Sequence, residues 1–326
     1  MKAILLDRYP DGVPRAADFA LADVPQPEPG EGQLLVRVSH LSMDPFPRLR
    51  MRADSRVGPP MALGGVVEGR GVGEVVASRH PDFQAGDWLT GETGWAELAV
   101  LDGQRAERID LSLGPPQAHL HALGATGLAA TFVVESIFPR LRETVVVAPA
   151  AGAVGSLVCQ IARHVAPEAR VMGTARGTAQ AEFLRGMGVE PLDPDADWPG
   201  PGGIDALVDG VGGTFHDRML RALNPRARVL LLGFVAGYND TGPPRYGNAH
   251  SVLMKRAQMW GFLLSDHMDR ADEARARIAT WLRDGHVRPA MSVHAGLGSA
   301  PAAFAALFGE PPPGKQIVRV ADDGED

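Results

Sequence analysis

The turn after the apolar run Val145–Ala148 carries the residue types of a phosphate-binding loop. It reads Ala150-Ala-Gly-Ala-Val-Gly155 and leads into a segment with helical spacing of apolar residues. Glycine at 152 allows a backbone to approach a pyrophosphate, and glycine at 155 allows the helix to pack tightly on the strand. The first N–H groups of that helix then face the phosphates. The predicted dinucleotide-binding residues of this turn are Ala151, Gly152, Ala153, Val154 and Gly155. A strand, turn and helix with a purely structural role is the alternative.

The end of the next strand indicates which dinucleotide is bound. An NAD-binding unit usually places Asp or Glu there, where the carboxylate accepts hydrogen bonds from the ribose. Here the strand ends at Thr174, and no carboxylate follows until Glu182. Arg176 occupies the position where a 2′-phosphate would lie, and a guanidinium matches a phosphate with a forked pair of hydrogen bonds. We therefore expect NADPH, held at its adenosine end by Thr174 and Arg176. The alternative for Arg176 is a solvated loop arginine.

Composition excludes several classes of protein. The 326 residues suffice for two domains, and the net charge of −7, with no basic run, argues against a nucleic-acid partner. The first residues become charged too early for a signal peptide, and no apolar run is long enough to cross a membrane. The single cysteine, Cys159, excludes a disulfide within the chain and a Cys-based zinc site, and the histidines show no metal-ligand spacing. We expect a cytoplasmic protein without a metal or a membrane anchor.

Two kinds of pattern follow one another along the chain. Residues 1–100 contain short strands separated by Gly, Pro and Asp, which is typical of a barrel-like all-β unit. From Val145 onward, strands and helices alternate, which predicts an α/β unit with a doubly wound parallel sheet. Further β-like segments near the end are expected to rejoin the first unit. The predicted domains are residues 1–117 with 293–326, and residues 118–292. The expected helices are His119–Ser136, Ser156–Val165, Gln180–Met187, Thr214–Leu223 and Asp269–Asp284.

Several unusual strings occur in a fixed order along nearly the whole chain. They are Leu41-Ser-Met-Asp-Pro-Phe-Pro-Arg48, Gly71-Val-Gly-Glu-Val-Val-Ala-Ser78, Gly127-Leu-Ala-Ala130, Asp209-Gly-Val-Gly-Gly213, Gly237-Tyr-Asn-Asp-Thr-Gly-Pro243 and Pro301-Ala-Ala-Phe304. Together with Ala150–Gly155 and Gly314-Lys315, these strings resemble the zinc-independent branch of the medium-chain dehydrogenases/reductases. The resemblance is to the double-bond reductases in that branch, namely the prostaglandin, alkenal/one and curcumin reductases.

The resemblance implies a fold, a cofactor and an activity. The fold would be a GroES-like β-barrel domain beside a Rossmann-type NADPH-binding domain, and homodimers are common in the family. The activity would be reduction of the C=C bond of an α,β-unsaturated ketone or aldehyde, by hydride transfer without a metal. Phe262 and Leu263 match the family positions along the nicotinamide. Gly233 ends a predicted strand at the sheet edge where ligands bind in such folds.

The chain also departs from the family pattern. Phe46 replaces a tyrosine that follows the Asp-Pro pair, and Met254 aligns with a tyrosine on the nicotinamide side of the cleft. Gln180 aligns with a lysine that helps to hold the 2′-phosphate. Family asparagines are missing at Gly210 and in the segment 311–313. We therefore expect cofactor binding with altered contacts, and a less polar substrate site lined by Phe46 and Met254.

Without a metal, a hydroxyl group must stabilise the charge that develops on the conjugated oxygen of the substrate. Tyr238 lies just beyond a predicted strand, and Tyr246 lies in a loop of the kind that covers a cleft. We predict that both are catalytic, with loop packing as the alternative for each of them. Asp44 and Arg48 are expected to form a structural pair rather than an acid/base couple.

Two other functions stay open at this point. The less polar substrate site fits a pathway-specific tailoring reductase that acts on an enone, imine or quinone in a large natural-product intermediate. The missing tyrosines permit a redox-silent NADPH-binding protein.

Overall fold

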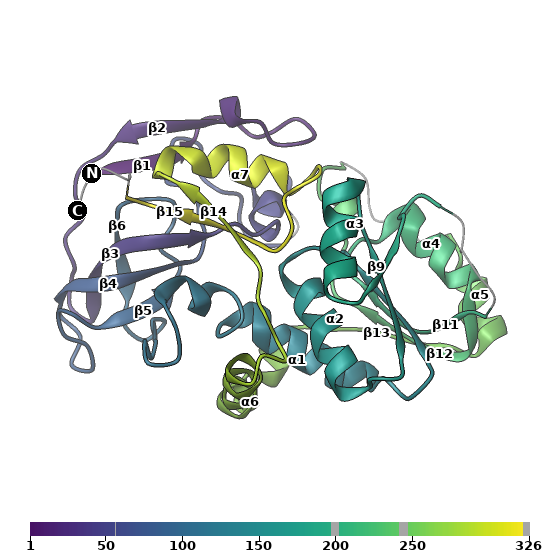
Figure 1. The fold of residues 1–326 in the computed structure, drawn as a ribbon. Helices are drawn as coiled ribbons and strands as arrows, with labels where there is room; N and C mark the ends of the chain where they lie inside the picture. Colours follow the sequence, from purple (N-terminus) through teal and green to yellow (C-terminus); the bar gives the residue numbers. More distant parts are fainter. Residues whose placement is uncertain (56, 197–201, 241–246, 322–326) are drawn as a thin grey trace. The chain divides into compact units, whose positions relative to one another are not determined.

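The computed structural model describes residues 1–55, 57–196, 202–240 and 247–321. The chain forms two compact units (Figure 1). Unit 1 consists of Met1–His121, Met291–Pro311 and Lys315–Asp326, and unit 2 consists of Ala122–Ala290 and Pro312–Gly314. The short segment 312–314 belongs to unit 2, whereas the sequence led us to expect the whole of 293–326 in the first domain.

Unit 1 is built mainly from antiparallel strands. A seven-stranded sheet has the order β14-β15-β3-β4-β5-β7, with β6 paired to β3, and β1 and β2 form a separate pair. Its elements are β1 Lys2–Leu6, η1 Ala16–Asp18, β2 Phe19–Asp23, β3 Gln33–Ser42, η2 Phe46–Arg50, β4 Gly71–Ser78, β5 Trp88–Gly91, β6 Leu98–Asp102, β7 Glu107–Arg108, η3 Pro116–Leu120, β14 Met291–Ala295, η6 Leu297–Ser299, α7 Ala300–Ala306 and β15 Lys315–Arg319.

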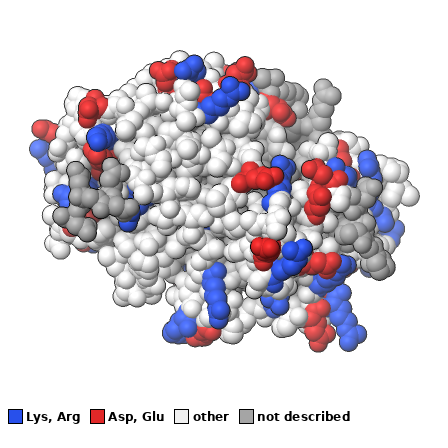
Figure 2. All heavy atoms as spheres, turned by 45° about the horizontal axis from the view of Figure 1, so that its top comes forward, with Lys and Arg blue, Asp and Glu red and all other residues white. Residues whose placement is uncertain are grey.

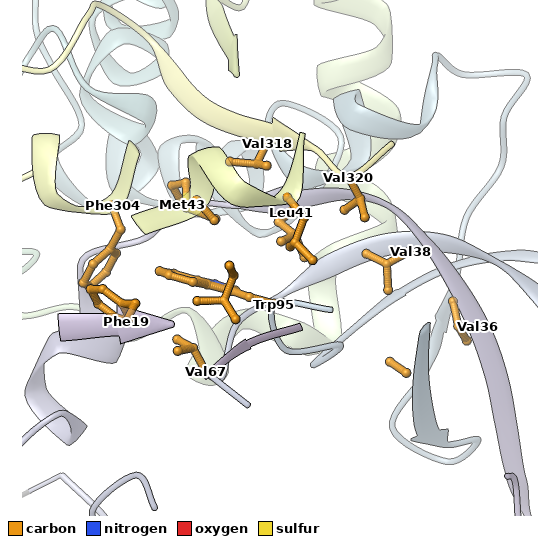
Figure 3. Packing of buried hydrophobic residues seen from close by; sticks show 14 of the residues in the cluster. Phe19, Val36, Val38, Leu41, Met43, Val67, Trp95, Phe304, Val318 and Val320 are labelled. Carbon is orange, nitrogen blue, oxygen red and sulfur yellow. The ribbon is translucent and has the colours of Figure 1, made fainter. Parts of the chain in front are cut away.

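Three aromatic rings organise the core of unit 1. Trp95 lies 5.5 Å from Phe19 and 5.4 Å from Phe304, measured between ring centroids, and the Trp95–Phe304 pair has an edge-on geometry. Apolar side chains from β3 and β15, among them Leu41 and Val318, point into the same cluster (Figure 3). These residues lie far apart in the sequence, so their packing joins both ends of the chain into one unit.

Unit 2 is a six-stranded parallel sheet with helices on both faces. The strand order β10-β9-β8-β11-β12-β13 is that of a Rossmann fold, and α4 and α5 lie on the opposite face from α2 and α3 (Figure 1). Its elements are α1 Ala125–Ile137, β8 Thr144–Ala148, α2 Ala153–Val165, β9 Arg170–Thr174, α3 Gly177–Gly186, β10 Glu190–Leu192, β11 Ile204–Asp209, α4 Gly213–Arg221, β12 Leu223–Leu231, η4 Val235–Gly237, α5 Ala249–Lys255, β13 Gln258–Gly261, η5 Leu264–Arg270 and α6 Ala271–Arg283. The predicted combination of a doubly wound parallel sheet with an N-terminal β-sheet unit is confirmed.

The burial of the central strands of unit 2 explains why these strands could be predicted from the sequence. β8 is buried along most of its length, with Val145 and Val146 fully buried, because helices cover both faces of the sheet. The helix α2 is apolar on the side that packs on the sheet, and Cys159 lies in that buried side. Burial raises the pKa of the Cys159 thiol to about 12. The thiol is therefore protonated and inert, as expected of a core residue.

Some elements differ from the expectation. The helix predicted from His119 begins only at Ala125, because Gly124 takes an extended conformation as its N-cap. In the part of the chain that the structure describes, no helix is long and apolar enough to cross a membrane.

Candidate cofactor and active site

The carboxyl ends of β8 and β11 mark the place in unit 2 where a ligand would bind. From β8 the chain proceeds through β9 to β10 on one side, while β11, β12 and β13 follow on the other side. In open α/β sheets, ligands bind beyond the carboxyl ends of the strands at such a reversal of strand order. The segments that follow β8, β9, β11, β12 and β13 therefore make up the candidate site.

The turn after β8 has the shape that a pyrophosphate requires. Gly152 is the N-cap of α2, and a Cβ atom added to it would meet nothing closer than 3.8 Å. The space beside Gly152 is thus open for a ligand atom. A Cβ atom on Gly155 would lie only 1.9 Å from the carbonyl oxygen of Pro149. The two glycines have separate roles: Gly152 leaves room at the turn, and Gly155 lets α2 pack closely against Pro149.

The segment 312–314 runs beside this turn. The N–H group of Gly314 donates to the carbonyl oxygen of Ala151 at 2.8 Å, and Gly152 and Gly314 form an isolated parallel bridge. Gly314 has a φ of 86°, and a Cβ atom there would lie 2.3 Å from the carbonyl oxygen of Ala290. This position requires glycine, and the segment is joined to the turn by the bond to Ala151.

At the end of β9, Thr174 is buried and Arg176 is exposed. Arg176 is the N-cap of α3, and its N–H group donates to Oε1 of Gln180 at 2.9 Å. Gln180 is therefore part of the corner between β9 and α3 (residues 174–180), although the sequence suggested only that it replaces a family lysine. The helix was expected to begin at Gln180, whereas it begins at Gly177, so no signal in the sequence pointed to this bond.

The loop after β11 is fixed by a buried carboxylate. Asp209 Oδ1 accepts hydrogen bonds from the N–H groups of Val211 and Gly212 at 2.8 and 2.9 Å, and Oδ2 lies 2.7 Å from Nδ1 of His216. The N–H group of Gly210 donates to the carbonyl oxygen of Ala148 at 2.6 Å. The ends of β8 and β11 are thereby tied together. Asp209 and His216 were not predicted as site residues, although the Asp209–Gly213 string is part of the family resemblance.

Tyr238 lies on the loop after β12, beside the other candidate residues. Its hydroxyl oxygen is 3.6 Å from the place that a Cβ atom on Gly233 would take, and the Phe234 backbone hydrogen-bonds to it. The carbonyl oxygen of Gly210 accepts a hydrogen bond from the N–H of Val235 at 3.1 Å, which joins the loops after β11 and β12. Burial raises the pKa of Tyr238 above its ordinary value, despite the opposing effect of the backbone bond. The hydroxyl is thus protonated at neutral pH and able to donate.

Phe262 and Leu263 follow directly after β13. Phe262 is 8% exposed, and its N–H donates to the carbonyl oxygen of Leu231 at 3.0 Å, whereas the Leu263 side chain is 67% exposed. The ring of His267 stacks between Phe262 and Phe132, with centroid distances of 5.1 and 5.0 Å. Phe262 therefore stacks on His267, which stacks in turn on Phe132. The exposed apolar side chain of Leu263 follows Phe262 in the chain.

One predicted residue of unit 2 does not join this group. Met254 is 57% exposed on α5, which ends just before β13 begins, so it lies toward the amino ends of the strands. Phe262 and Leu263 lie at the carboxyl ends. Tyr246 falls outside the described residues.

In unit 1, the Asp44 carboxylate is part of a different pair from the one expected. Lys315 Nζ, 1% exposed as a side chain, lies 2.5 Å from Asp44 Oδ1, and the Ser42 hydroxyl donates to Asp44 Oδ2 at 2.5 Å. The predicted pair of Asp44 with Arg48 is wrong. Arg48 is buried and donates to the carbonyl oxygens of Gly12 and Met51. Phe46, in η2, is 54% exposed.

Charges shape the pKa of this carboxylate. Burial alone would raise the pKa of Asp44, but the Lys315 ammonium and the Ser42 hydroxyl hold it below its ordinary value. The side chain of Asp44 is still 42% exposed. The carboxylate is thus ionised at neutral pH and serves as the counter-ion of a buried lysine.

The surface carries charged side chains of both signs on the face shown in Figure 2. On the face shown in Figure 2, acidic and basic side chains lie interspersed around a broad uncharged area. Among the described residues, no group of three or more His, Cys, Asp or Glu side chains is placed to hold a metal ion. Chemistry without zinc stays a prediction.

Comparisons with known proteins agree with this architecture. Residues 2–109 match a family model described as the N-terminal domain of oxidoreductase, and residues 188–318 match one described as zinc-binding dehydrogenase. The chain is 35% identical to the NADPH-dependent curcumin reductase of Escherichia coli, over 98% of this chain and 96% of that protein. It is 29% identical to the NADP(+)-dependent 2-alkenal reductase of Nicotiana tabacum, over 98% and 97% of the two chains.

A solved structure extends the likeness to three dimensions. CurA of Vibrio vulnificus in complex with NADPH is 32% identical and superposes with a TM-score of 0.88, over 99% of this chain and 100% of that one. The chain therefore belongs to the medium-chain dehydrogenase/reductase superfamily and, within it, to the NADP-dependent oxidoreductases that include the curcumin, prostaglandin and alkenal reductases.

Proposed function

We propose that this protein reduces the C=C bond of an α,β-unsaturated ketone or aldehyde. The cofactor is NADPH, which supplies the hydride when bound. The observation that carries the proposal is the turn at Gly152, which leaves open space at the helix N-terminus of a Rossmann sheet in a chain related to curcumin and alkenal reductases. Metal-free chemistry, a homodimer and a cytoplasmic location belong to the same proposal.

Different residues of unit 2 bind different parts of the cofactor. The turn Ala151–Gly155 receives the pyrophosphate, because its glycine leaves room and the first N–H groups of α2 point outward. Thr174 and Arg176 take the adenosine end, where the exposed guanidinium pairs with the 2′-phosphate. Gly233, Phe262 and Leu263 line the nicotinamide end.

The substrate needs a group that stabilises charge on its conjugated oxygen. Tyr238 suits this role, because its hydroxyl is protonated at neutral pH, as in an ordinary tyrosine, and lies beside Gly233. A hydroxyl that stays protonated can donate a hydrogen bond as the oxygen becomes negative. Tyr246 is proposed as a second hydroxyl from the sequence alone, whereas Met254, near the amino end of β13, is not part of the proposed substrate site. Phe46 of unit 1 offers an exposed apolar ring for substrate contact.

The experiment is a comparison of matched substrates. NADPH oxidation is followed with a panel of enones and enals, with the corresponding saturated carbonyl compounds as controls, and the products are identified by mass spectrometry. Turnover of the unsaturated members only, with a product heavier by two hydrogens and an intact carbonyl, supports the proposal. Turnover of the saturated ketones, or of quinones alone, contradicts it.

The size of the substrate is a separate question that the same panel answers. The replacement of a polar family residue by the exposed Phe46 favours bulky apolar enones over small ones. Tight NADPH binding with slow turnover of short alkenals and fast turnover of aryl enones would indicate a tailoring reductase for large intermediates. Tight NADPH binding without turnover of any substrate would indicate a redox-silent protein.

A further inference from the structure

The amide side chain of Gln180 is almost buried at the start of α3 and folds back onto the chain before the helix. Gln180 is 8% exposed, and its Oε1 accepts a hydrogen bond from the N–H of Arg176 at 2.9 Å. The preceding residue, Ala175, donates its own N–H to the carbonyl oxygen of Leu192 at 3.0 Å. Two consecutive amides after β9 are therefore anchored, one to the neighbouring strand β10 and one to the side chain of Gln180.

This anchoring fixes the direction in which Arg176 leaves the backbone. Arg176 is extended, with φ −103° and ψ 124°, and the next residue, Gly177, has a φ of 70°, a region that favours glycine. The chain thus makes a defined bend between the anchored amide and the helix. The Arg176 side chain is exposed at this bend, next to the buried Thr174 at the carboxyl end of β9.

A long cationic side chain such as that of arginine binds a phosphate more tightly when its backbone is fixed, because less conformational freedom is lost on binding. Gln180 supplies such a hold with a neutral group. Its oxygen is engaged with the chain rather than turned to the solvent, so the charge at this corner comes from Arg176. The bond joins residue 180 to the backbone of Arg176 and leaves the guanidinium itself available to a ligand.

We propose that Gln180 is a positioning residue for cofactor choice, which orients Arg176 toward the 2′-phosphate of NADPH without contacting that phosphate. The inference deepens the proposed function, since it rests on the NADPH site at Arg176. It assigns the ribose 2′-phosphate as the group that this corner recognises, and it divides recognition between a charged contact residue and a neutral support.

The test is a double-mutant cycle read out by calorimetric titration of NADPH and of NADH, which lacks the 2′-phosphate. The variants are Gln180→Met, which keeps the length of the side chain and removes the acceptor, Arg176→Ala, and the two combined. We expect Gln180→Met to weaken NADPH binding about 5- to 10-fold, as for a lost hydrogen bond. NADH binding should change less than about twofold. In the Arg176→Ala background, Gln180→Met should have no further effect on NADPH, because residues that act through one another are not additive.

Two results would overturn the proposal. Equal weakening of NADPH and NADH by Gln180→Met would show that Gln180 only supports the fold. Full additivity with Arg176→Ala would show that Gln180 contacts the phosphate independently. Thermal melting of each protein without cofactor shows whether the variants are folded.

A second substitution keeps the proposal testable if Gln180→Met does not fold. Gln180→Glu retains an oxygen acceptor for the Arg176 amide, so NADH binding should stay close to that of the wild type, and thermal melting checks that this variant is folded. Its negative charge beside Arg176 should weaken NADPH binding by more than about tenfold. Unchanged NADPH binding in this variant would place the phosphate elsewhere and end the proposal. These titrations contain no enone, so their failure and a failure of enone reduction are separate results.

Discussion

The methyl group of Ala150 fills the space that a side chain on Gly173 would need. A Cβ atom added to Gly173 would lie 2.4 Å from Cβ of Ala150, which is fully buried. The fingerprint of a dinucleotide-binding turn has glycine at the position of Ala150, to make the turn tight. In this chain the glycine that relieves the crowding lies instead in the neighbouring strand β9.

An exchange of the two residues measures this compensation. Gly173→Ala should destabilise the protein by about 1–3 kcal/mol, because it forces two methyl groups into one space. Ala150→Gly should cost about 1 kcal/mol through a small cavity and added chain freedom. The combined variant should be more stable than the sum of the two losses predicts. Urea unfolding of the four proteins gives these free energies, and strict additivity would show that Ala150 and Gly173 do not compete for space.

The Ala150–Gly173 pair also shows which parts of the fold were readable from the sequence. Parallel strands such as β8 were predicted because both faces are buried, which leaves an uninterrupted apolar run. The turn was predicted from Gly152 and Gly155. The reason why alanine is tolerated at 150 was not, because it depends on a neighbour in another strand.

Short elements and long-range partners were the parts that the sequence did not reveal. The helices α5 and α7 have 7 residues each, and helices this short depend on tertiary packing rather than on their own pattern. The partner of Asp44 is Lys315, 271 positions away, whereas local spacing pointed to Arg48. Likewise, the ring of His267 gave no sequence signal, because its neighbours Phe132 and Phe262 come from separate elements.

Gly152 and Gly155 provide a matched pair for separating cofactor binding from stability. Gly152→Ala should keep the free energy of unfolding within about 0.5 kcal/mol of the wild-type value, because no atom of the chain lies closer than 3.8 Å to the added Cβ. The same substitution should weaken NADPH binding about tenfold or more. Gly155→Ala should destabilise the fold by about 3 kcal/mol, because its Cβ would collide with the Pro149 carbonyl. Calorimetric titration and denaturant unfolding check both. A Gly152→Ala protein that binds NADPH like the wild type would remove the pyrophosphate from this turn.

The Asp44–Lys315 pair should make the stability of unit 1 depend on pH. The folded pKa of Asp44 lies below its ordinary value, so the folded state releases this proton more readily than the unfolded state. The stabilisation is complete above the ordinary pKa of about 3.9 and is lost as pH falls through the lower folded pKa.

A substitution isolates this contribution. Asp44→Asn should cost about 3 kcal/mol at neutral pH, because it leaves the buried Lys315 ammonium without its counter-ion. The difference from the wild type should be constant above about pH 4 and shrink below it, as the wild-type carboxylate takes up its proton. Combining Asp44→Asn with Lys315→Met should recover part of the loss. If the difference in unfolding free energy between variant and wild type does not depend on pH, the Asp44–Lys315 pair is not what stabilises unit 1.

The ring stack below Phe262 should matter for the nicotinamide end of the cofactor site. His267→Ala removes the middle ring and should raise the KM for NADPH several-fold, while His267→Phe keeps the stacking and should restore it. Met268→Ala, at an exposed neighbour in the same short helix, is the control. Steady-state kinetics with NADPH as the varied substrate decide the matter. If the phenylalanine variant is as poor as the alanine variant, the imidazole has a polar role that stacking does not explain.

Tyr238→Phe removes only the hydroxyl whose pKa is raised by burial, so it tests the proposed role in catalysis most directly. If the hydroxyl donates to the developing oxyanion, kcat should fall about 100-fold or more, as for the loss of an oxyanion-stabilising donor. The affinity for NADPH and the melting temperature should stay close to wild type, because the ring and its packing remain. Tyr9→Phe, which removes a hydroxyl that donates to the Met61 carbonyl in unit 1, is the control for loss of a tyrosine hydroxyl as such. Titration of the two purified variants with NADPH separates binding from turnover. A Tyr238→Phe enzyme with unchanged kcat would leave Tyr238 as an anchor of its loop, and the charge on the substrate oxygen would then have to be stabilised by another donor.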